Sequence, residues 1–304
     1  MPDNVSGKVV LITGPARGIG AETARLLAAG GARLSLVGLE PERLTALASE
    51  LGAGHVWFEC DVTDQAALER AVGATVEALG GIDVVIANAG IANNGTVAVA
   101  PVETLARTIE VNLTGVVRTV SATLPHVVER RGYYLLISSA AAIAALPGMA
   151  AYAAAKSGVE QFGNVLRLEL AHKGVAVGVA HPAWIDTDLV RDVRQDLRSF
   201  DAMLGRLPGP FGKMTSVGVC AAALARAVGR RSRKVYVPRM LASLSALRNL
   251  FNSSLSDRML RRHTARLVPE AEREVLALGR SFGVHSMGLN KKAEADAARK
   301  HPTT

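Results

Sequence analysis

The sequence has 304 residues, of which 49% are apolar, 20% charged and 4% aromatic, so we expect one globular domain with an aliphatic core and an extension. The net charge of +8 is uneven, since residues 1–225 carry 18 Lys and Arg against 21 Asp and Glu, whereas residues 226–304 carry 17 against 6. The first three quarters therefore have the charge balance of an ordinary soluble protein, and the basic excess lies in the tail.

Cysteine content and hydropathy argue against a disulfide-rich protein and against a membrane-spanning protein. Cys60 and Cys220 are too few for a disulfide framework, so we expect a reducing, cytoplasmic environment. Residues 1–8 are polar and contain no apolar signal region. The longest apolar stretch, residues 140–155, is interrupted by Pro147 and Gly148 and is too weak to span a bilayer.

Near the N-terminus, a glycine loop joins a predicted strand to a predicted helix. Residues 8–13 (KVVLIT) are a β-branched apolar run, typical of a buried parallel strand. Residues 14–20 (GPARGIG) follow, and a helical pattern continues to residue 29. Glycines there let the backbone approach a pyrophosphate, and the helix N-terminus supplies N–H donors. The spacing is not the standard G-x-G-x-x-G, so a plain tight turn is the competing interpretation.

Residues 33–37 (RLSLV) form the second predicted strand, and the positions after it bear on the choice of dinucleotide. In this type of fold an acidic residue about 20 positions past the glycines usually binds the ribose diol of adenosine. Gly38 stands there, and Glu40 follows two positions later. Arg17 could pair with a 2′-phosphate, whereas Glu40 could bond a 2′-hydroxyl or simply begin the next helix. NAD and NADP both stay open, with a lean to NADP because no Asp occupies position 38.

The following segments alternate between strands and helices. Predicted strands cover residues 56–60 and 82–87, and predicted helices cover residues 64–79 and 104–124. Alternation at this spacing predicts an α/β protein with a doubly wound parallel sheet. The strand at residues 82–87 ends in small residues, which would let the backbone close on a ligand.

Ser139, Tyr152 and Lys156 form the candidate catalytic group. Ser139 follows an apolar run that is typical of a buried strand. Tyr152 and Lys156 are four residues apart in an alanine-rich segment, so they share one face of a predicted helix. A lysine cation beside a phenol favours the phenolate and would lower the tyrosine pKa. The alternative is a surface Tyr and Lys on an ordinary amphipathic helix.

Seven short motifs, in order, resemble the short-chain dehydrogenase/reductase family over residues 5–240. They are TGPARGIG, Asp61-Val62, NAG at residues 88–90, VNLTG with Asn112, ISS with Ser139, Tyr152 with Lys156, and HPAWIDTDL. The step from Ser139 to Tyr152 is 13 residues, which fits the family. The resemblance implies a Rossmann fold and an oxidoreductase that uses NAD or NADP.

The resemblance also implies roles for individual residues. Tyr152 would exchange a proton with the substrate oxygen, and Lys156 would lower the Tyr152 pKa and bond the nicotinamide ribose. Ser139 would position the carbonyl or alcohol, and Asn112 would hold a water that links Lys156 to bulk solvent. The implied cofactor-binding residues are Gly14, Arg17, Gly18, Ile19, Gly20, Glu40, Asp61, Val62, Asn88, Ala89, Gly90, Tyr152, Lys156, Pro182, Ile185 and Thr187. No metal ligand is implied.

Two positions depart from the family pattern. Ala183 follows Pro182 where the family has glycine, which leaves the geometry at the nicotinamide carboxamide less defined. Gly38 lacks the acidic residue, which leaves the cofactor choice open.

Residues 188–211 are expected to cap the substrate. A surface helical hairpin is the competing interpretation. The segment places six apolar side chains among charged residues: Leu197, Phe200, Met203, Leu204, Leu207 and Phe211. Together with Leu146, Met149 and Trp184, they predict an apolar pocket for a lipophilic secondary alcohol or ketone.

We expect a dehydrogenase domain at residues 1–239 and a basic helical extension at residues 240–304. Met240, Leu244, Leu247 and Phe251 have helical spacing, and residues 288–304 are expected to fray. The stripe would pack on the body or on a sister subunit, with weak peripheral membrane contact as a secondary hypothesis. A homo-oligomer is expected, because the family usually assembles through the helices that carry Asn112 and Tyr152. Nothing in the sequence supports nucleic-acid binding.

Two other functional classes compete with an oxidoreductase. A non-catalytic dinucleotide-binding scaffold has no need of the tyrosine–lysine pair. A serine hydrolase is disfavoured, because the sequence has no G-x-S-x-G elbow.

Overall fold

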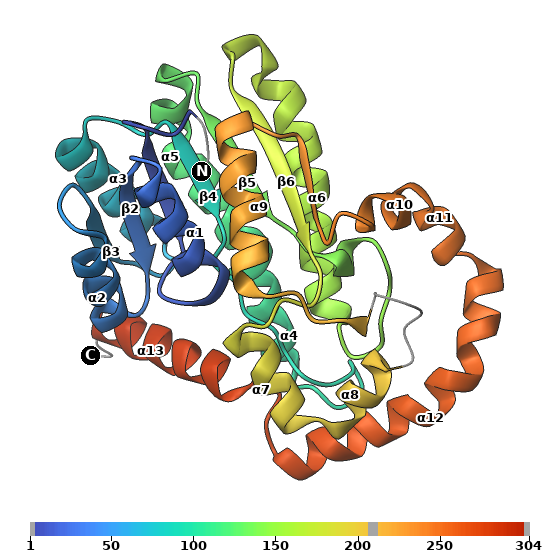
Figure 1. The fold of residues 1–304 in the computed structure, drawn as a ribbon. Helices are drawn as coiled ribbons and strands as arrows, with labels where there is room; N and C mark the ends of the chain where they lie inside the picture. The colour runs from blue at the N-terminus through green and yellow to red at the C-terminus, as the bar shows by residue number, and fades with distance from the viewer. Residues whose placement is uncertain (1–3, 206–211, 301–304) are drawn as a thin grey trace.

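The computed structural model describes residues 4–205 and 212–300. In this part of the chain seven strands form one parallel sheet in the order β3-β2-β1-β4-β5-β6-β7, which confirms the predicted doubly wound α/β fold (Figure 1). Their bounds are β1 Val9–Thr13, β2 Arg33–Gly38, β3 Val56–Glu59, β4 Val84–Ala87, β5 Tyr133–Ile137, β6 Ala176–Pro182 and β7 Lys234–Val237. Strands β1, β4 and β5 are buried along their whole length, which explains their continuous apolar sequences.

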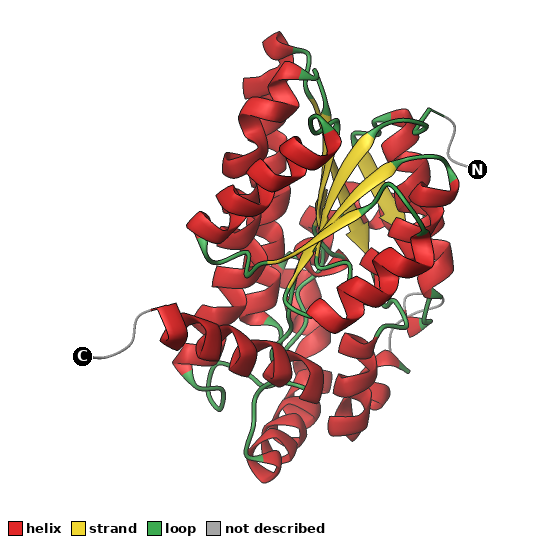
Figure 2. Cartoon of the chain, turned by 90° about the vertical axis from the view of Figure 1, so that its left-hand side faces the viewer, coloured by secondary structure: helices red, strands yellow, loops and turns green. Residues whose placement is uncertain are grey.

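Helices cover both faces of the sheet (Figure 2). On one face α1 (Gly18–Ala29) packs against α9 (Val217–Arg230), and α2 (Pro41–Leu51) lies beside α1. On the other face α3 (Gln65–Leu79) packs against α5 (Gly115–Glu129), with α6 (Ala150–Leu170) over β5 and β6. Each face has its own aliphatic core, so the sheet is buried on both sides.

The site is positioned by the point where the strand order reverses. Strand β1 pairs with β2 on one side and with β4 on the other. The connection after β1 therefore leads to β2 on one side, and the connection after β4 leads to β5 on the opposite side. In an open parallel sheet this arrangement leaves a crevice at the carboxyl ends of the strands, where ligands bind. The segments after β1, β4, β5 and β6 all meet there.

The helix expected at residues 104–124 is present and contains one irregular turn. Helix α4 (Val102–Ile109) and helix α5 are joined by one π-helical turn, η1, at Glu110–Thr114. Asn112 lies in the middle of this turn. Such single π-turns inside α-helices are frequent at functional sites.

Two short helices, α7 (Asp188–Asp196) and α8 (Arg198–Leu204), lie beside the sheet in the segment that we expected to cap the substrate, and we call them the cap. Residues 206–211 of the predicted capping segment lie outside the described residues. A third apolar cluster joins this cap to the C-terminal extension through Phe200, Leu204 and Val275. The cap is therefore packed from below by residues that are distant in sequence.

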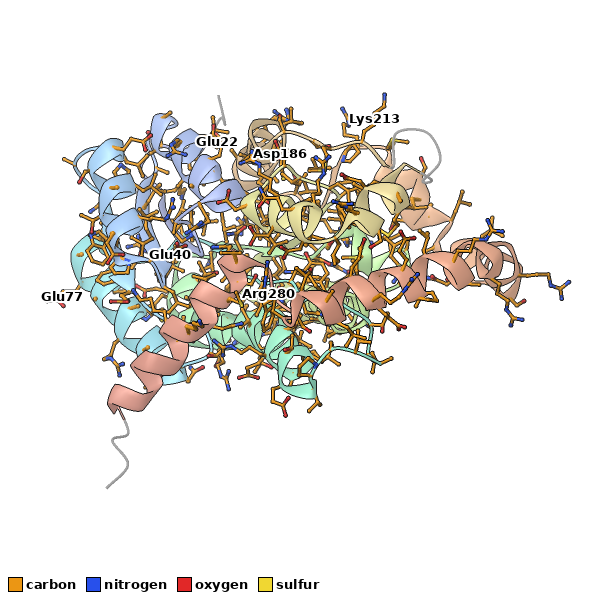
Figure 3. All side chains as sticks on the ribbon, turned by 90° about the horizontal axis from the view of Figure 1, so that it is seen from below. Glu22, Glu40, Glu77, Asp186, Lys213 and Arg280 are labelled. Carbon is orange, nitrogen blue, oxygen red and sulfur yellow. The ribbon has the colours of Figure 1, made fainter. Side chains whose placement is uncertain are left out.

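The C-terminal extension consists of four helices in the described part of the chain. Residues 240–251 form two short helices, α10 (Leu241–Ala246) and α11 (Arg248–Phe251), rather than one. Helix α12 (Ser254–Leu278) passes beneath α8, and α13 (Val284–Lys300) lies below α2 and beside α7 (Figures 1 and 3). Residues 288–300, part of the segment that we expected to fray, belong to α13.

No helix among the described residues has the length and apolar character needed to cross a membrane.

Candidate active site

The glycine loop after β1 leaves the backbone accessible at the start of α1. Gly14 and Gly18 have positive φ angles of 65° and 56°, which favour glycine. A Cβ atom on Gly14 would lie 2.8 Å from the Ala89 Cα, and one on Gly20 would lie 2.6 Å from the Gly14 carbonyl oxygen. Because Arg17 makes no side-chain cap bond to α1, the first N–H groups of that helix are free to bind an anion.

Asn88 holds this loop against the end of β4. Its side-chain Nδ2 donates to the carbonyl oxygens of Thr13 and Gly14 at 3.1 and 3.0 Å. The backbone N–H groups of Asn88 and Ala89 donate to the Thr13 hydroxyl at 3.0 and 3.1 Å. Asn88 borders the cleft, and its amide fixes the shape of the glycine loop.

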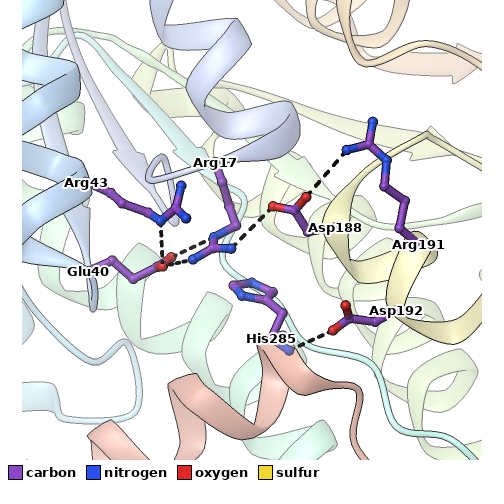
Figure 4. Close-up of polar contacts among 7 residues, drawn as sticks. All are labelled: Arg17, Glu40, Arg43, Asp188, Arg191, Asp192 and His285. Carbon is purple, nitrogen blue, oxygen red and sulfur yellow. Dashed lines mark hydrogen bonds and ion pairs between the residues drawn. The ribbon is translucent and has the colours of Figure 1, made fainter. Parts of the chain in front are cut away.

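Glu40 and Arg17 face one another at one end of the cleft (Figure 4). The Arg17 Nε donates to Glu40 Oε2 at 3.1 Å, and Arg17 Nη2 donates to the other carboxylate oxygen. Arg17 Nη1 also donates to Asp188 Oδ2 at 3.3 Å. A second arginine, Arg43, lies 3.4 Å from Glu40 Oε1. Arg17 is therefore held by two carboxylates, which the sequence argument for a 2′-phosphate did not anticipate.

Asp61 and Val62 follow β3 on the same side of the cleft. Asp61 Oδ1 accepts a hydrogen bond from the Thr63 backbone at 2.8 Å, and Asp61 Oδ2 accepts one from Arg107 Nη2 at 2.9 Å. Arg107, on α4, also lines the cleft, and the sequence analysis missed it. A single arginine far from any glycine loop gave no recognisable signal.

Tyr152 and Lys156 project from the same face of α6, as their spacing predicted. The Lys156 Nζ lies 5.6 Å from the centre of the Tyr152 ring and donates to the Ile137 carbonyl at 3.0 Å. Ser139, at the end of β5, accepts a hydrogen bond from the Ala141 N–H at 3.1 Å. Its hydroxyl also interacts with that of Tyr152. The three side chains therefore meet above the carboxyl end of β5.

Burial changes the protonation of this group. Burial lowers the pKa of Lys156 to about 8. Burial also raises the pKa of Tyr152 above its usual value, and the Ser139 hydroxyl partly opposes that rise. We expected the lysine to lower the tyrosine pKa. In this structure desolvation is the largest influence on the Tyr152 pKa, and it acts in the opposite direction.

Asn112 lies beneath Lys156 with one unused acceptor. Its Nδ2 donates to the carbonyl oxygens of Ile91 and Thr108, both at 2.8 Å. Its Oδ1 is buried and has no hydrogen-bond partner in the described part of the chain. A Cβ atom on Gly90 would lie 2.6 Å from this oxygen and 3.5 Å from Lys156 Nζ, so only glycine leaves the space beside both groups. A buried acceptor of this kind suits a bound water.

Pro182, Ile185 and Thr187 follow β6 on the far side of the cleft. Ile185 is buried, and the Thr187 side chain approaches Gly18, where a Cβ atom would lie 3.3 Å from Thr187 Cγ2. Ala183, the position that departs from the family pattern, donates its backbone N–H to Val237 at 2.8 Å.

All the predicted cofactor-binding and catalytic residues border one cleft of about 210 Å³. The cleft has the fixed backbone turns, free helix N–H groups and orphaned Asn112 oxygen that a bound dinucleotide and its water would use. The sequence analysis missed His285, Leu289 and Asn290, which reach this cleft from α13. Leu289 and Asn290 lie in the segment that was expected to fray, and no motif marks any of the three.

A second cavity, of about 280 Å³, opens beside the first. Among its walls are the residues predicted for an apolar pocket: Leu146, Met149, Trp184, Leu197, Phe200 and Met203. Trp184 and Phe200 meet edge to face, with ring centroids 5.2 Å apart. Leu267 and Val268 of α12 close the cavity from below, which the sequence did not indicate.

Ser139 and Tyr152 line both cavities. A molecule in the second cavity would therefore meet a molecule in the first at the candidate catalytic group. This is the arrangement that transfer between a cofactor and a substrate requires.

Comparison with known proteins agrees with this geometry. Residues 8–198 match the family model described as short chain dehydrogenase. Trans-4-hydroxycyclohexanecarboxylate dehydrogenase of Sinomonas cyclohexanicum is 36% identical over 202 residues, which cover 64% of this chain and 78% of that protein. A 3-alpha-(or 20-beta)-hydroxysteroid dehydrogenase of Mycobacterium bovis is 34% identical over 211 residues, covering 69% and 80%.

Solved structures show the same fold. The crystal structure of levodione reductase superposes with a TM-score of 0.72 at 25% identity, covering 79% of this chain and 99% of that one. The chain therefore belongs to the short-chain dehydrogenase/reductase family of NAD(P)-dependent oxidoreductases.

Proposed function

We propose that this enzyme interconverts a lipophilic secondary alcohol and its ketone, with NAD as the cofactor. The observation that carries the proposal is that Ser139 and Tyr152 form the junction between the dinucleotide cleft and the apolar cavity. The nicotinamide, when bound, supplies or accepts the hydride. The protein supplies the proton and the orientation.

Each catalytic side chain has one proposed task. Tyr152 exchanges a proton with the substrate oxygen, and the Ser139 hydroxyl holds that oxygen in place. Lys156 binds the nicotinamide ribose. Asn112 holds a water through its unused Oδ1, and this water links Lys156 to bulk solvent. A Cβ atom on Gly90 would lie 2.6 Å from Asn112 Oδ1 and 3.5 Å from Lys156 Nζ, so both groups border the same small space. This supports the relay.

The second cavity supports a mainly apolar substrate. Two of its polar side chains already have protein partners, since Thr96 donates to Glu272 at 2.5 Å and Ser199 donates to Glu274 at 2.6 Å. The two related enzymes compared above are named for hydroxylated rings, a cyclohexanecarboxylate and a steroid. We therefore propose a secondary alcohol carried on an aliphatic ring.

A purified sample tests the function directly. Addition of NADH or NADPH should enhance cofactor fluorescence, and a panel of cyclic secondary alcohols should reduce the oxidised cofactor. Small charged hydroxy acids serve as the control substrates. If the protein binds neither NADH nor NADPH, the proposal is contradicted.

The preference for NAD rests on the surroundings of Arg17. A 2′-phosphate would have to take Arg17 from Glu40 while approaching the carboxylate of Asp188. The Glu40 carboxylate can instead accept hydrogen bonds from a ribose diol. We therefore propose NAD, in place of the sequence-based lean to NADP.

We also propose a homo-oligomer that uses the outer faces of α5 and α6. Val117, Val165 and Leu168 are exposed there by 38%, 43% and 64% of their surface. Neighbouring apolar side chains on one surface favour association with a second copy. Light scattering should give more than the monomer mass, and Leu168→Glu should shift it toward the monomer, with Leu276→Glu on α12 as the control.

Residues 240–304 are proposed as an extension that packs on the domain. Leu241 is buried, the Tyr236 hydroxyl donates to or accepts from Ser245 at 3.0 Å, and Arg248 donates to the Ala142 carbonyl at 2.8 Å. Leu247 and Leu250 stay about half exposed, at 52% and 56%. The side chain of Phe251, predicted in the same stripe, lies outside the described residues.

Weak membrane contact through this basic surface is the secondary proposal. Flotation with anionic liposomes at low and high salt tests it, since electrostatic binding weakens with salt. If the protein does not float with the liposomes at low salt, only the proposed packing role of residues 240–304 stands.

A further inference from the structure

Helix α13 brings three side chains to the dinucleotide cleft from outside the segment that matches the family model. His285, Leu289 and Asn290 border the cleft, whereas the family match ends at residue 198. The His285 imidazole lies beside Arg17 at the Glu40 end (Figure 4). Asn290 reaches the part of the cleft formed by Asp61 and Arg107. These positions place α13 along the adenosine half of the cleft.

The start of α13 is firmly docked. The His285 backbone N–H donates to Asp192 Oδ2 on α7 at 2.7 Å, and a Cβ atom on Gly283 would lie 2.7 Å from the Asp192 Cβ. About two turns later, Lys292 forms an ion pair with Glu59 of β3 at 2.7 Å. Leu289, between these anchors, packs on the core cluster around β3, β4 and α5. The helix therefore spans from the substrate cap to the edge of the sheet.

Asn290 is held in a defined orientation. Arg107 Nε lies 3.2 Å from Asn290 Oδ1, and the same guanidinium donates to Asp61 Oδ2 at 2.9 Å. A guanidinium can only donate, so the amide oxygen must face Arg107 and the amide nitrogen must face away from it. That nitrogen, Nδ2, is buried and has no hydrogen-bond partner in the described part of the chain, and the residue is only 8% exposed.

We propose that α13 is the outer wall of the adenosine site and that Asn290 is a cofactor-binding residue that donates a hydrogen bond to the adenosine. An unpaired buried donor is costly, and the ring nitrogens and ribose oxygens of adenosine are acceptors. Arg107 then acts as a positioning residue, because it orders Asp61 and Asn290 together. This inference rests on the proposed dinucleotide function, but it holds for NAD and NADP alike, since both contain adenosine.

Binding measurements on the full chain test the role of Asn290. Dissociation constants for NADH and NADPH come from cofactor fluorescence, and competition with ADP-ribose reports the adenosine half alone. Asn290→Leu keeps the side-chain size and removes the donor, and it should weaken NADH and ADP-ribose by about 3- to 10-fold. Lys291→Ala, an exposed neighbour on the same helix, is the matched control and should leave both constants unchanged.

Hydrogen exchange on the unmodified protein tests the wall without any substitution. ADP-ribose should slow amide exchange in residues 284–293, because the bound ligand would hold α13 closed. An unchanged exchange rate there, or unchanged ADP-ribose affinity in a folded Asn290→Leu variant, would overturn the inference. If Asn290→Leu fails to fold, the exchange result on the unmodified protein decides alone.

The two proposals fail in different ways. If the unmodified protein binds neither dinucleotide nor ADP-ribose, the proposed function fails. If it binds them while α13 shows no protection, only the role of α13 fails.

Discussion

The Lys156 ammonium lies 5.6 Å from the centre of the Tyr152 ring, one helical turn away on α6, and both side chains project toward the end of β5. The ammonium bonds the Ile137 carbonyl, while the phenol interacts with Ser139. Their proximity thus comes from helix geometry, but the partner of each polar group comes from β5. The proposed roles of Tyr152 and Lys156 can be tested separately by substitution.

Tyr152→Phe should reduce turnover by about 10²- to 10⁴-fold, because the proton donor is lost while the ring still packs. Cofactor affinity should stay within experimental error of the unmodified enzyme. Steady-state rates and fluorescence titration measure the two effects. Tyr236→Phe makes the same chemical change on β7, outside both cavities, and should leave turnover intact. Near-normal turnover of the Tyr152 variant would remove this residue from the mechanism.

Lys156→Met should slow turnover and weaken cofactor binding, yet it should stabilise the fold. The folded pKa of about 8 lies below the ordinary value of 10.5, so between these values the unfolded chain binds more protons. The cost of burying the ammonium is therefore fully present below pH 8 and disappears as pH rises toward 10.5. The gain at pH 7 should be at most about 3 kcal/mol.

Denaturant unfolding of Lys156→Met at several pH values measures this effect. The stability difference from the unmodified protein should shrink above pH 8. Lys173→Met, at an exposed position, is the control. A variant that is less stable at pH 7 and unchanged in its pH dependence would show that the lysine is not buried as an unpaired cation.

Glu40→Gln should move cofactor preference toward NADP. Removing this carboxylate frees Arg17 from its bidentate partner and removes one repulsive charge from the site of a 2′-phosphate. The ratio of the NADP to the NAD dissociation constant should fall by about 10-fold or more. Glu42→Gln, exposed on α2, should leave the ratio unchanged. If the unmodified enzyme already binds NADP more tightly than NAD, our cofactor assignment is wrong.

Glu160→Gln should destabilise the contact between α6 and the start of the extension. His181, 3.5 Å away, together with Arg248 and Lys234, holds the pKa of this buried carboxyl at about 2. A carboxyl with a depressed pKa contributes stability above its ordinary value of 4.5 and loses it as pH falls toward 2.

The loss in Glu160→Gln at pH 7 should be about 1–3 kcal/mol and should narrow below pH 4.5. Thermal unfolding as a function of pH measures it. Glu169→Gln, at an exposed position on the same helix, should unfold like the unmodified protein. Equal stability of Glu160→Gln and the unmodified protein at pH 7 would show that this cluster does not anchor α11.

Local pattern was sufficient for the sheet and for the predicted residues of the cleft. A β-branched run, a glycine loop and a helical pattern in succession indicated a strand that enters a helix. Gly14 and Gly18 have positive φ angles, which are costly for other residues, and this explains the glycines in the loop. Helical spacing likewise determined that Tyr152 and Lys156 share a face. These relationships depend on neighbours within a few residues, which sequence displays directly.

The remaining features depend on contacts between distant segments, which periodicity does not encode. The partners of Arg17 come from Glu40 and Asp188, and those of Asn290 come from Arg107, 183 residues earlier. The sequence predicted a lowered Tyr152 pKa, whereas burial raises it. Burial of the phenol depends on tertiary packing, which the sequence pattern does not display. The sequence by itself determined the fold and the candidate catalytic group, whereas only tertiary packing decided that the basic tail becomes a wall of both cavities.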